Sequence, residues 1–334
     1  MQLDQARNYV FGPNGAGKTS LLEGAFLLGR GRSFRTRQTA RLVQKGRAGL
    51  SAYAIMTGGE RLGVSFLDGV LQCKINGETT RSLAELSQLL RVHVIDPSSH
   101  ELIEGGPSVR RRYLDASVFH VEHHYLAEWR TYRRVLGQRN ALLKRGMGGA
   151  GLDVWTRQLV ATGEKIDQRR SAQVAALGQA FSGFGERLLS QPIVLEYRCG
   201  WRRGATLGEA LDSSRQRDRE AGFTQVGPHR ADLVVQMAGQ RVRDVASRGQ
   251  QKLIAAALVL AQVQTLAKLL GHGGLLLIDD PAAELDSGAL RRLLSQVEAL
   301  RAQVMITAIA EADLPAAGAA AVFHVEQGKV KAMV

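Results

Sequence analysis

Cysteine is scarce in this 334-residue chain, which contains only Cys73 and Cys199. Two thiols are too few for a disulfide framework or a thiolate metal site, so a reducing compartment is indicated. We find no apolar run long enough to cross a bilayer, and the first seven residues lack the apolar core of a secretion signal. These absences predict a cytoplasmic protein with no membrane partner.

Acidic residues are few relative to basic ones. There are 44 Lys and Arg against 31 Asp and Glu, a formal net charge of +13, and no acid interrupts the basic stretch from Arg30 to Arg47. An excess of this size favours a polyanionic partner, because clustered cations release counterions from phosphates. A basic surface that merely keeps the protein soluble is the alternative. The 45% of hydrophobic residues can form a core, and the length suits two lobes.

A phosphate-binding loop is the most specific motif that is present. The segment from Gly12 to Thr19 has the pattern Gly, four residues, Gly-Lys-Thr. Its glycines let successive backbone N–H groups converge on phosphate oxygens, and the following helix adds its positive end. We expect Lys18 to reach the β- and γ-phosphates of ATP and the Thr19 hydroxyl to hold Mg²⁺. The ATP-binding candidates are therefore Gly12, Pro13, Asn14, Gly15, Ala16, Gly17, Lys18 and Thr19.

Two carboxylates follow an apolar run far downstream. Residues 275–278 read as a buried parallel strand, and Asp279 and Asp280 come directly after it. We assign Asp279 to Mg²⁺ together with Thr19, and Asp280 to the polarisation of an attacking water. Lys18 and Asp280 are thus the catalytic candidates. A strand-end Asp pair alone more often caps the next element, and the phosphate-binding loop is what makes this pair informative.

Two further segments narrow the class of protein. Ser247, Arg248, Gly249 and Gln250 stand directly before a long apolar helix, upstream of the strand that ends in Asp279. This order is typical of ABC-type ATPases, in which such a signature binds the γ-phosphate of a nucleotide held by the other subunit. Glu284 and Asp286 resemble the loop that crosses the same dimer interface. The alternative for Ser247 is that it simply caps its helix.

The distribution of patterns predicts two lobes. Residues 1–95 and 220–334 carry the nucleotide motifs, with short antiparallel strands expected over 50–75 and a tight turn at Asn76-Gly77. Residues 96–219 read as an inserted, mainly α-helical lobe. Residues 202–222, which extend past its end, read as a polar surface excursion. The expected fold class is α/β, an ABC-type P-loop ATPase head with a mixed sheet plus the inserted helical lobe.

Arginines are concentrated in the predicted helical lobe. Such rows would contact phosphates without regard to base sequence, which favours DNA as the polyanion. The alternative is that several of them form ordinary surface ion pairs with Asp115, Glu122 or Glu128. The DNA-binding candidates are Arg110, Arg111, Arg112, Arg130, Arg133 and Arg134.

Several segments together resemble the bacterial RecF family from Asn8 to about Val325. The matching segments are 29–36, 106–115, 132–144, 227–230 and 247–251. The resemblance implies a protein that binds ATP and Mg²⁺, forms an ATP-dependent homodimer, and binds double-stranded, gapped and single-stranded DNA. It also implies that RecR-like and RecO-like mediators are partners in loading the RecA recombinase, and that a weak, DNA-dependent ATPase activity serves release.

Three departures from that family affect these expectations. The strand before the phosphate-binding loop is reduced to about 9–11, so we expect that the central sheet loses an edge or that the start of the chain is damaged, and nucleotide binding would suffer if the edge is lost. Ala231 stands where the family usually has Asp. Thr307-Ala308 replaces the switch histidine of general ABC proteins, which indicates weak hydrolysis. A degenerate, non-hydrolysing DNA-binding scaffold is therefore one alternative; another SMC-like ATPase is disfavoured by the absence of long heptads.

Overall fold

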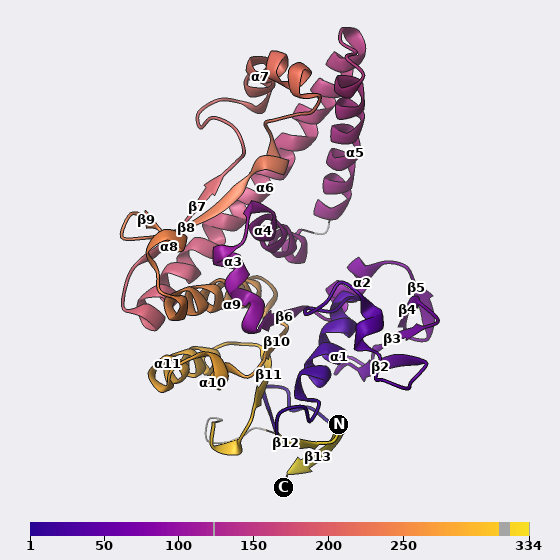
Figure 1. Cartoon of the computed structure of the whole chain (residues 1–334), viewed down its shortest axis with the longest axis vertical. Coiled ribbons are helices and arrows are strands. Elements are labelled where there is room, and N and C mark those ends of the chain that lie inside the picture. Colours follow the sequence, from indigo (N-terminus) through magenta and orange to yellow (C-terminus); the bar gives the residue numbers. More distant parts are fainter. Residues whose placement is uncertain (123, 314–320, 334) are drawn as a thin grey trace. The chain divides into compact units, whose positions relative to one another are not determined.

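The computed structural model describes residues 1–122, 124–313 and 321–333 (Figure 1). The chain divides into two compact units. The first unit comprises Met1–His100, Arg187–Ser190 and Ser247–Val334, and the second comprises Glu101–Glu186 and Gln191–Ala246. The sequence placed the return to the ATPase lobe at residue 220. The structure differs there, because β8 (Asp232–Met237) pairs with β7 (Ile193–Arg198) and so belongs to the second unit.

A six-stranded mixed sheet forms the centre of the first unit. Its order is β13-β12-β1-β11-β10-β6, and only β13 runs antiparallel to its neighbour. The strands are β1 (Arg7–Phe11), β6 (Val92–Ile95), β10 (Leu275–Ile278), β11 (Gln303–Ala308), β12 (Ala321–Glu326) and β13 (Lys329–Met333). The expected mixed α/β sheet is confirmed. The strand before the phosphate-binding loop is longer than the predicted 9–11: β1 covers Arg7–Phe11, lies inside the sheet and pairs with β11 and β12.

A four-stranded antiparallel sheet accompanies it in the first unit. Its order is β2-β3-β4-β5, with bounds β2 (Gly49–Ile55), β3 (Arg61–Leu67), β4 (Val70–Ile75) and β5 (Glu78–Thr80). Asn76 and Gly77 have φ of 52° and 92°, so the tight turn predicted there is confirmed. One face of the sheet joins the hydrophobic core that also contains the apolar side of α1 (Lys18–Arg30).

Helix α9 (Arg248–Leu270) corrects one sequence-based prediction. It is long and apolar enough to cross a membrane, although no such segment was expected, and 78% of its most apolar window is buried. Its residues from Leu253 to Ala261 are all buried in the first unit, so α9 is a core helix. The remaining helices of this unit include α2 (Leu83–Leu89), α10 (Pro281–Glu284) and α11 (Ser287–Glu298).

The second unit is mainly helical and carries a small sheet, β7-β8-β9, with β9 at Gln240–Arg241. Its helices are α3 (Glu101–Glu104), α4 (Pro107–Val121), α5 (Tyr125–Lys144), α6 (Ala150–Leu189), α7 (Leu207–Ala221) and α8 (Val242–Val245). The predicted polar excursion was wrong, because most of it forms α7. That helix starts with a capping box of Thr206 and Glu209 and ends at Gly222 with φ of 75°, and both features stabilise helix ends.

Candidate nucleotide-binding site

The phosphate-binding loop joins β1 to α1, and glycines shape it (Figure 1). Gly15 and Gly17 have φ of 77° and 110°, a region that disfavours other residues. A β-carbon at Gly12 would lie 2.1 Å from the carbonyl oxygen of Val325, so β12 leaves room only for glycine. No side chain caps the start of α1, so its first N–H groups remain available to an anion.

Lys18 and Thr19 begin α1 and turn toward the loop and the strand ends. The Lys18 Nζ donates to the carbonyl oxygens of Gly12 and Pro13 at 2.7 and 3.1 Å, and the residue is buried. It has no ion pair among the described residues, so its charge is free for a phosphate. The Thr19 hydroxyl donates to the two carboxylate oxygens of Asp279 at 3.0 and 3.1 Å.

Asp279 and Asp280 are held in place by a residue that sequence reasoning did not assign to the site. The Thr307 hydroxyl donates to Asp279 Oδ1 at 2.9 Å and accepts from the Asp280 backbone N–H at 2.9 Å. Asp280 has φ of 45°, and its buried Oδ1 has no hydrogen-bond partner in the described part of the chain. Burial raises the pKa of Asp280, with Lys18 opposing and Asp279 adding to the rise. This carboxylate is therefore available to accept a proton.

These residues line one open cleft of the first unit. The lining residues are Asn14, Gly15, Gly17, Lys18, Thr19, Ser20, Arg35, Asp96, Pro97, Ser98, Asp279, Asp280, Ala283 and Glu284. Sequence reasoning did not place Arg35 or Asp96 here. Asp96 follows the buried strand β6 as Asp279 follows β10, and that shared pattern was the available signal. Arg35 is positioned by Glu23, which accepts from its backbone N–H at 3.2 Å.

The donor set fits Mg²⁺ and a triphosphate. A hydroxyl and a carboxylate, the ligands that Mg²⁺ uses in such sites, meet at Thr19 and Asp279, which would hold the ion. When bound, Mg²⁺ neutralises phosphate charge. The loop amides and Lys18 would hold the phosphates, and Asp280, whose buried Oδ1 has no partner among the described residues, lines the same cleft.

The predicted signature residues lie elsewhere on the first unit. Ser247 and Gln250 form a capping box at the start of α9, with the Ser247 hydroxyl accepting from the Gln250 N–H at 3.3 Å. Ser247, Arg248 and Gly249 are exposed, and none of the four signature residues lines the cleft. The structure thus shows the capping role and does not bring the signature to the cleft of the same chain.

The two predicted dimer-loop residues, Glu284 and Asp286, have different contacts. Glu284 lines the cleft and pairs with Lys252 at 2.5 Å between Oε2 and Nζ. Asp286 caps α11 by accepting from the Ala289 N–H at 2.8 Å, and that hydrogen bond lowers its pKa. The Glu284–Lys252 pair ties the first turn of α9 to the segment that follows the acidic pair.

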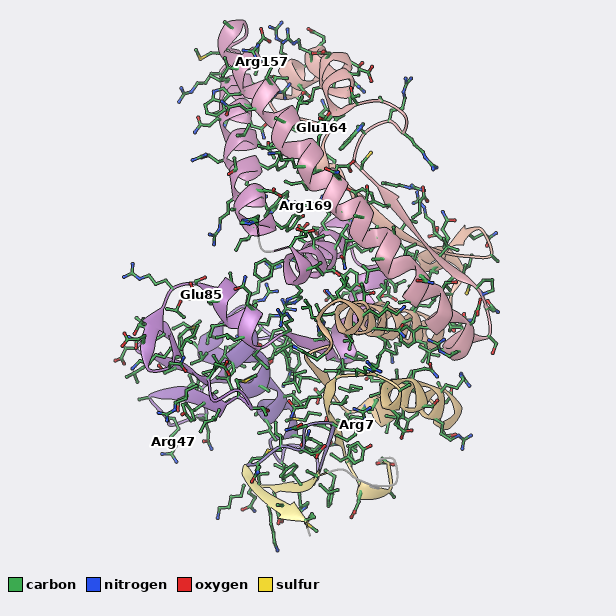
Figure 2. The ribbon with its side chains drawn as sticks, turned by 180° about the vertical axis from the view of Figure 1, so that it is seen from behind. Arg7, Arg47, Glu85, Arg157, Glu164 and Arg169 are labelled. Carbon is green, nitrogen blue, oxygen red and sulfur yellow. The ribbon has the colours of Figure 1, made fainter. Side chains whose placement is uncertain are left out.

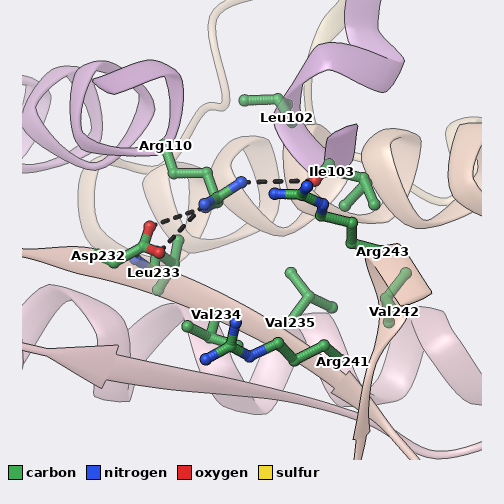
Figure 3. Close-up of a pocket in the computed structure, with 10 residues that line it drawn as sticks. All are labelled: Leu102, Ile103, Arg110, Asp232, Leu233, Val234, Val235, Arg241, Val242 and Arg243. Atoms are coloured by element: carbon green, nitrogen blue, oxygen red, sulfur yellow. Dashed lines mark hydrogen bonds and ion pairs between the residues drawn. The ribbon is translucent and has the colours of Figure 1, made fainter. Parts of the chain in front are cut away.

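Arg110 was predicted to contact DNA, and its surroundings contradict this. Its guanidinium pairs with both carboxylate oxygens of Asp232 at 2.8 and 3.1 Å (Figure 3). It also donates to the Gly105 carbonyl at 2.6 Å. The residue is buried, so its donors are taken up inside the second unit.

The other candidate arginines differ in exposure. Arg111 donates to the Ala231 carbonyl at 2.7 Å and is half-buried. Arg112 on α4 is exposed and has no ion pair among the described residues, and the same holds for three residues on α5, namely Arg130, Arg133 and Arg134.

The acids that were considered as partners are taken by other arginines. Arg169 pairs with Glu122 and Glu128 at 2.7 and 2.6 Å, and Arg170 pairs with Asp115 at 2.8 Å. The four exposed arginines therefore keep their charge for an external anion.

The fold and the cleft define an ATPase head of the ABC type, in which strand-end acids face a phosphate-binding loop on one sheet. A family model for the RecF/RecN/SMC N-terminal domain matches residues 1–331. The solved head of an SMC protein bound to the C-winged helix domain of ScpA shares the fold, with a TM-score of 0.57 at 15% identity over 100% of this chain and 91% of that one.

More similar proteins narrow the family. A DNA replication and repair protein RecF from Thioalkalivibrio sulfidiphilus is 40% identical, over 97% of this chain and 92% of that relative. One from Pseudomonas fluorescens is 37% identical over 97% and 91%. A solved recombination mediator protein RecF with ATP has a TM-score of 0.86 at 26% identity, covering 100% of this chain and 93% of its own. The chain belongs to the RecF family.

Proposed function

We propose that this chain is an ATP-dependent DNA-binding protein of recombinational repair and replication-gap maintenance, acting in the cytoplasm. It binds DNA at gaps as an ATP-linked dimer and helps RecO-like and RecR-like mediators to load the RecA recombinase. The observation that carries the ATP part is the meeting of Thr19 and Asp279 beside the phosphate-binding loop. A similar solved protein is described as RecF with ATP in the RecFOR pathway, which supports the pathway.

The chemistry of the cleft supports slow hydrolysis. Lys18 and the loop amides bind phosphates, and Asp280 polarises water. The unpartnered Oδ1 and the raised pKa of Asp280 are properties of a proton acceptor in a partly desolvated site. Thr307 offers only a neutral hydroxyl beside the acids, so the site lacks a second proton-accepting group at that position, and a low rate is expected.

The exposed signature supports an ATP-linked dimer. Ser247 already caps α9, yet Ser247, Arg248 and Gly249 remain exposed and absent from the cleft of their own chain. An N-terminal helix end of this kind attracts an anion. We infer that it meets the γ-phosphate bound by a second copy, with Glu284 at the same interface.

The decisive experiment measures ATP binding, assembly state and DNA affinity in Lys18→Met. The variant removes the ammonium group that faces the loop, so nucleotide binding and ATP-driven dimerisation should be lost, and the affinity for gapped DNA should no longer respond to ATP. Lys268→Met, which removes an exposed lysine of the same unit at the opposite end of α9 from the signature, is the matched control for ATP binding. ATP-insensitive DNA binding by the wild type would instead favour the non-hydrolysing scaffold.

A further inference from the structure

The outward face of the antiparallel sheet β2–β5 is open and carries no acid. Side chains alternate along the strands, so that Leu62, Val64 and Cys73 point into the core while their sequence neighbours point out. The only acid within the four strands, Glu78, pairs in register with Ile75 on the inner face. The outward residues are Ser51, Tyr53, Ile55, Arg61, Gly63, Ser65, Leu67, Val70, Gln72, Lys74 and Thr79.

An aromatic ring and two cations lie close together on this face. Tyr53, Gly63 and Lys74 form one cross-strand row, and Arg61 lies diagonal to Tyr53. The Tyr53 side chain is unusually open, at 61% exposure. Gly63 leaves no side chain beside the ring, where a β-carbon would lie 3.9 Å from Tyr53 Cδ2. A flat planar group can therefore reach the ring.

The charge around the sheet favours one kind of ligand for its outward face. No Asp or Glu occurs from residue 24 to residue 59, and the loop before β2 ends in the exposed Arg47, which points away from the ribbon (Figure 2). The outward face itself carries Arg61 and Lys74 and no acid, while Glu60 and Asp68 lie in the turns at the two ends of β3. Cations without an acid on the face favour a polyanion. An open aromatic ring favours a base with a free face, and bases in a duplex have none to offer.

We propose that the outward face of β2–β5 binds single-stranded nucleic acid, with one base stacked on Tyr53 and neighbouring phosphates held by Arg61, Lys74 and Arg47. The helical-lobe arginines are candidates for binding DNA, and this surface would be a separate site for the unpaired strand. The choice of DNA as the ligand rests on the proposed function. Strands of one sheet lie about 4.8 Å apart, so Tyr53 and Lys74 are separated by about two strand spacings, within the span of one nucleotide.

The test measures the affinity of the full chain for a short oligothymidylate by fluorescence anisotropy. Tyr53→Ala should weaken binding about tenfold, since loss of one stacked base costs about 1–3 kcal/mol, whereas Tyr53→Phe keeps the ring and the affinity. Leu269→Ala is the matched control, because Leu269 is an apolar residue of the same unit at 54% exposure that lies on α9 and not on the sheet, and it should change affinity less than about twofold. Lys74→Gln should make the log–log salt slope about 0.7 less negative.

A second readout does not depend on affinity. An oligonucleotide that carries 5-iodouracil, bound to the wild type and irradiated, should crosslink to the peptide that contains Tyr53. Affinity unchanged in Tyr53→Ala, or an equal loss in Leu269→Ala, would overturn the proposal. ATP-dependent binding of duplex DNA is measured in parallel. If it is absent while binding of the oligonucleotide still depends on Tyr53, the proposed function is rejected and the proposal for this surface is retained.

Discussion

At the scale of single residues, the cleft depends on which groups are partnered and which are not. Lys18 is held only by carbonyl oxygens, and Asp280 keeps one buried oxygen without a partner among the described residues, whereas Asp279 is fully engaged by two hydroxyls. Neighbouring carboxylates of identical chemistry thus have different surroundings. We therefore propose the partnered one as the Mg²⁺ ligand and the unpartnered one as the group that exchanges a proton.

Asp280→Asn should bind ATP and dimerise while hydrolysing it about a hundredfold more slowly, because loss of a general base typically costs a factor of about 10² to 10⁴. In the wild type the raised pKa of Asp280 also has a consequence for pH. Its carboxylate becomes protonated at a higher pH than an ordinary Asp, so the rate should fall on the acidic side and recover as pH rises. Steady-state phosphate release against pH measures both effects.

Asp279→Asn is the matched control for that variant, since it changes the neighbouring carboxylate and should lower Mg²⁺-dependent ATP binding itself. An Asp280→Asn protein with wild-type turnover would contradict the role given to Asp280.

Sequence reasoning was insufficient where the role of a residue depends on a partner that is far away in the sequence. The spacing from Gly12 to Thr19 is local, so its conformation was predictable. Arg110 was not, because the partner that buries it, Asp232, lies 122 positions away and no pattern near Arg110 indicates an ion pair. Thr307 was read only as a missing histidine, since its two hydrogen bonds depend on strands β10 and β11 lying side by side.

At the scale of elements, apolar periodicity predicted the helices and strands that have a buried apolar side. It did not predict a helix whose buried face is partly polar. The strand β10 and the helices α1 and α9 are rich in buried apolar residues and were expected from their patterns. Helix α7 has a narrow buried face made of Leu207, Leu211, Ser214 and Asp218. Half of that face is polar, and Asp218 is stabilised there by the buried Arg139, with 2.8 Å between Nη1 and Oδ2. A hydrophobic pattern therefore could not reveal it.

Helix α9 allows capping and nucleotide recognition to be separated. Ser247→Ala removes the cap and should lower the free energy of unfolding by about 1 kcal/mol. Ser247→Asp keeps a capping oxygen, so the stability should stay within about 0.5 kcal/mol of wild type, but its carboxylate would face the γ-phosphate of the partner copy. ATP-driven dimerisation should then be lost.

Urea unfolding gives the stability, and light scattering with and without ATP gives the assembly state. If Ser247→Asp dimerised with ATP as the wild type does, Ser247 would be a cap and nothing more.

At the scale of the whole molecule, positive charge is exposed where acids are already paired. Within the second unit, Asp115, Asp218 and Asp232 are each bound to a buried arginine. Internal neutralisation of the acids leaves the exposed arginines of α4 and α5 as net charge on the surface. The excess of +13 is therefore available to a polyanion.

Replacing Arg130, Arg133 and Arg134 together by glutamine should weaken duplex binding and make the log–log salt slope less negative. The change should be about 0.9 for each phosphate contact that is lost. These residues share one side of α5 through their spacing of three and four. Affinity for duplex DNA over a range of salt concentrations, measured with ATP, tests the prediction.

The control replaces Lys268, Arg291 and Arg301, which are residues of the first unit, and removes the same charge. An equal change of slope in both triple variants would show that net charge alone, and no surface of α5, determines binding.

The place of β1 inside its sheet bears on how the protein is made. As the ribosome releases the chain, the strand that leads into the phosphate-binding loop emerges before the second unit, whereas its neighbours β11 and β12 emerge after it. The second unit can fold as soon as Ala246 has left the tunnel. The nascent β1 keeps both edges unpaired until β11 and β12 have been made, so the phosphate-binding loop acquires its flanking strands only after the second unit is complete.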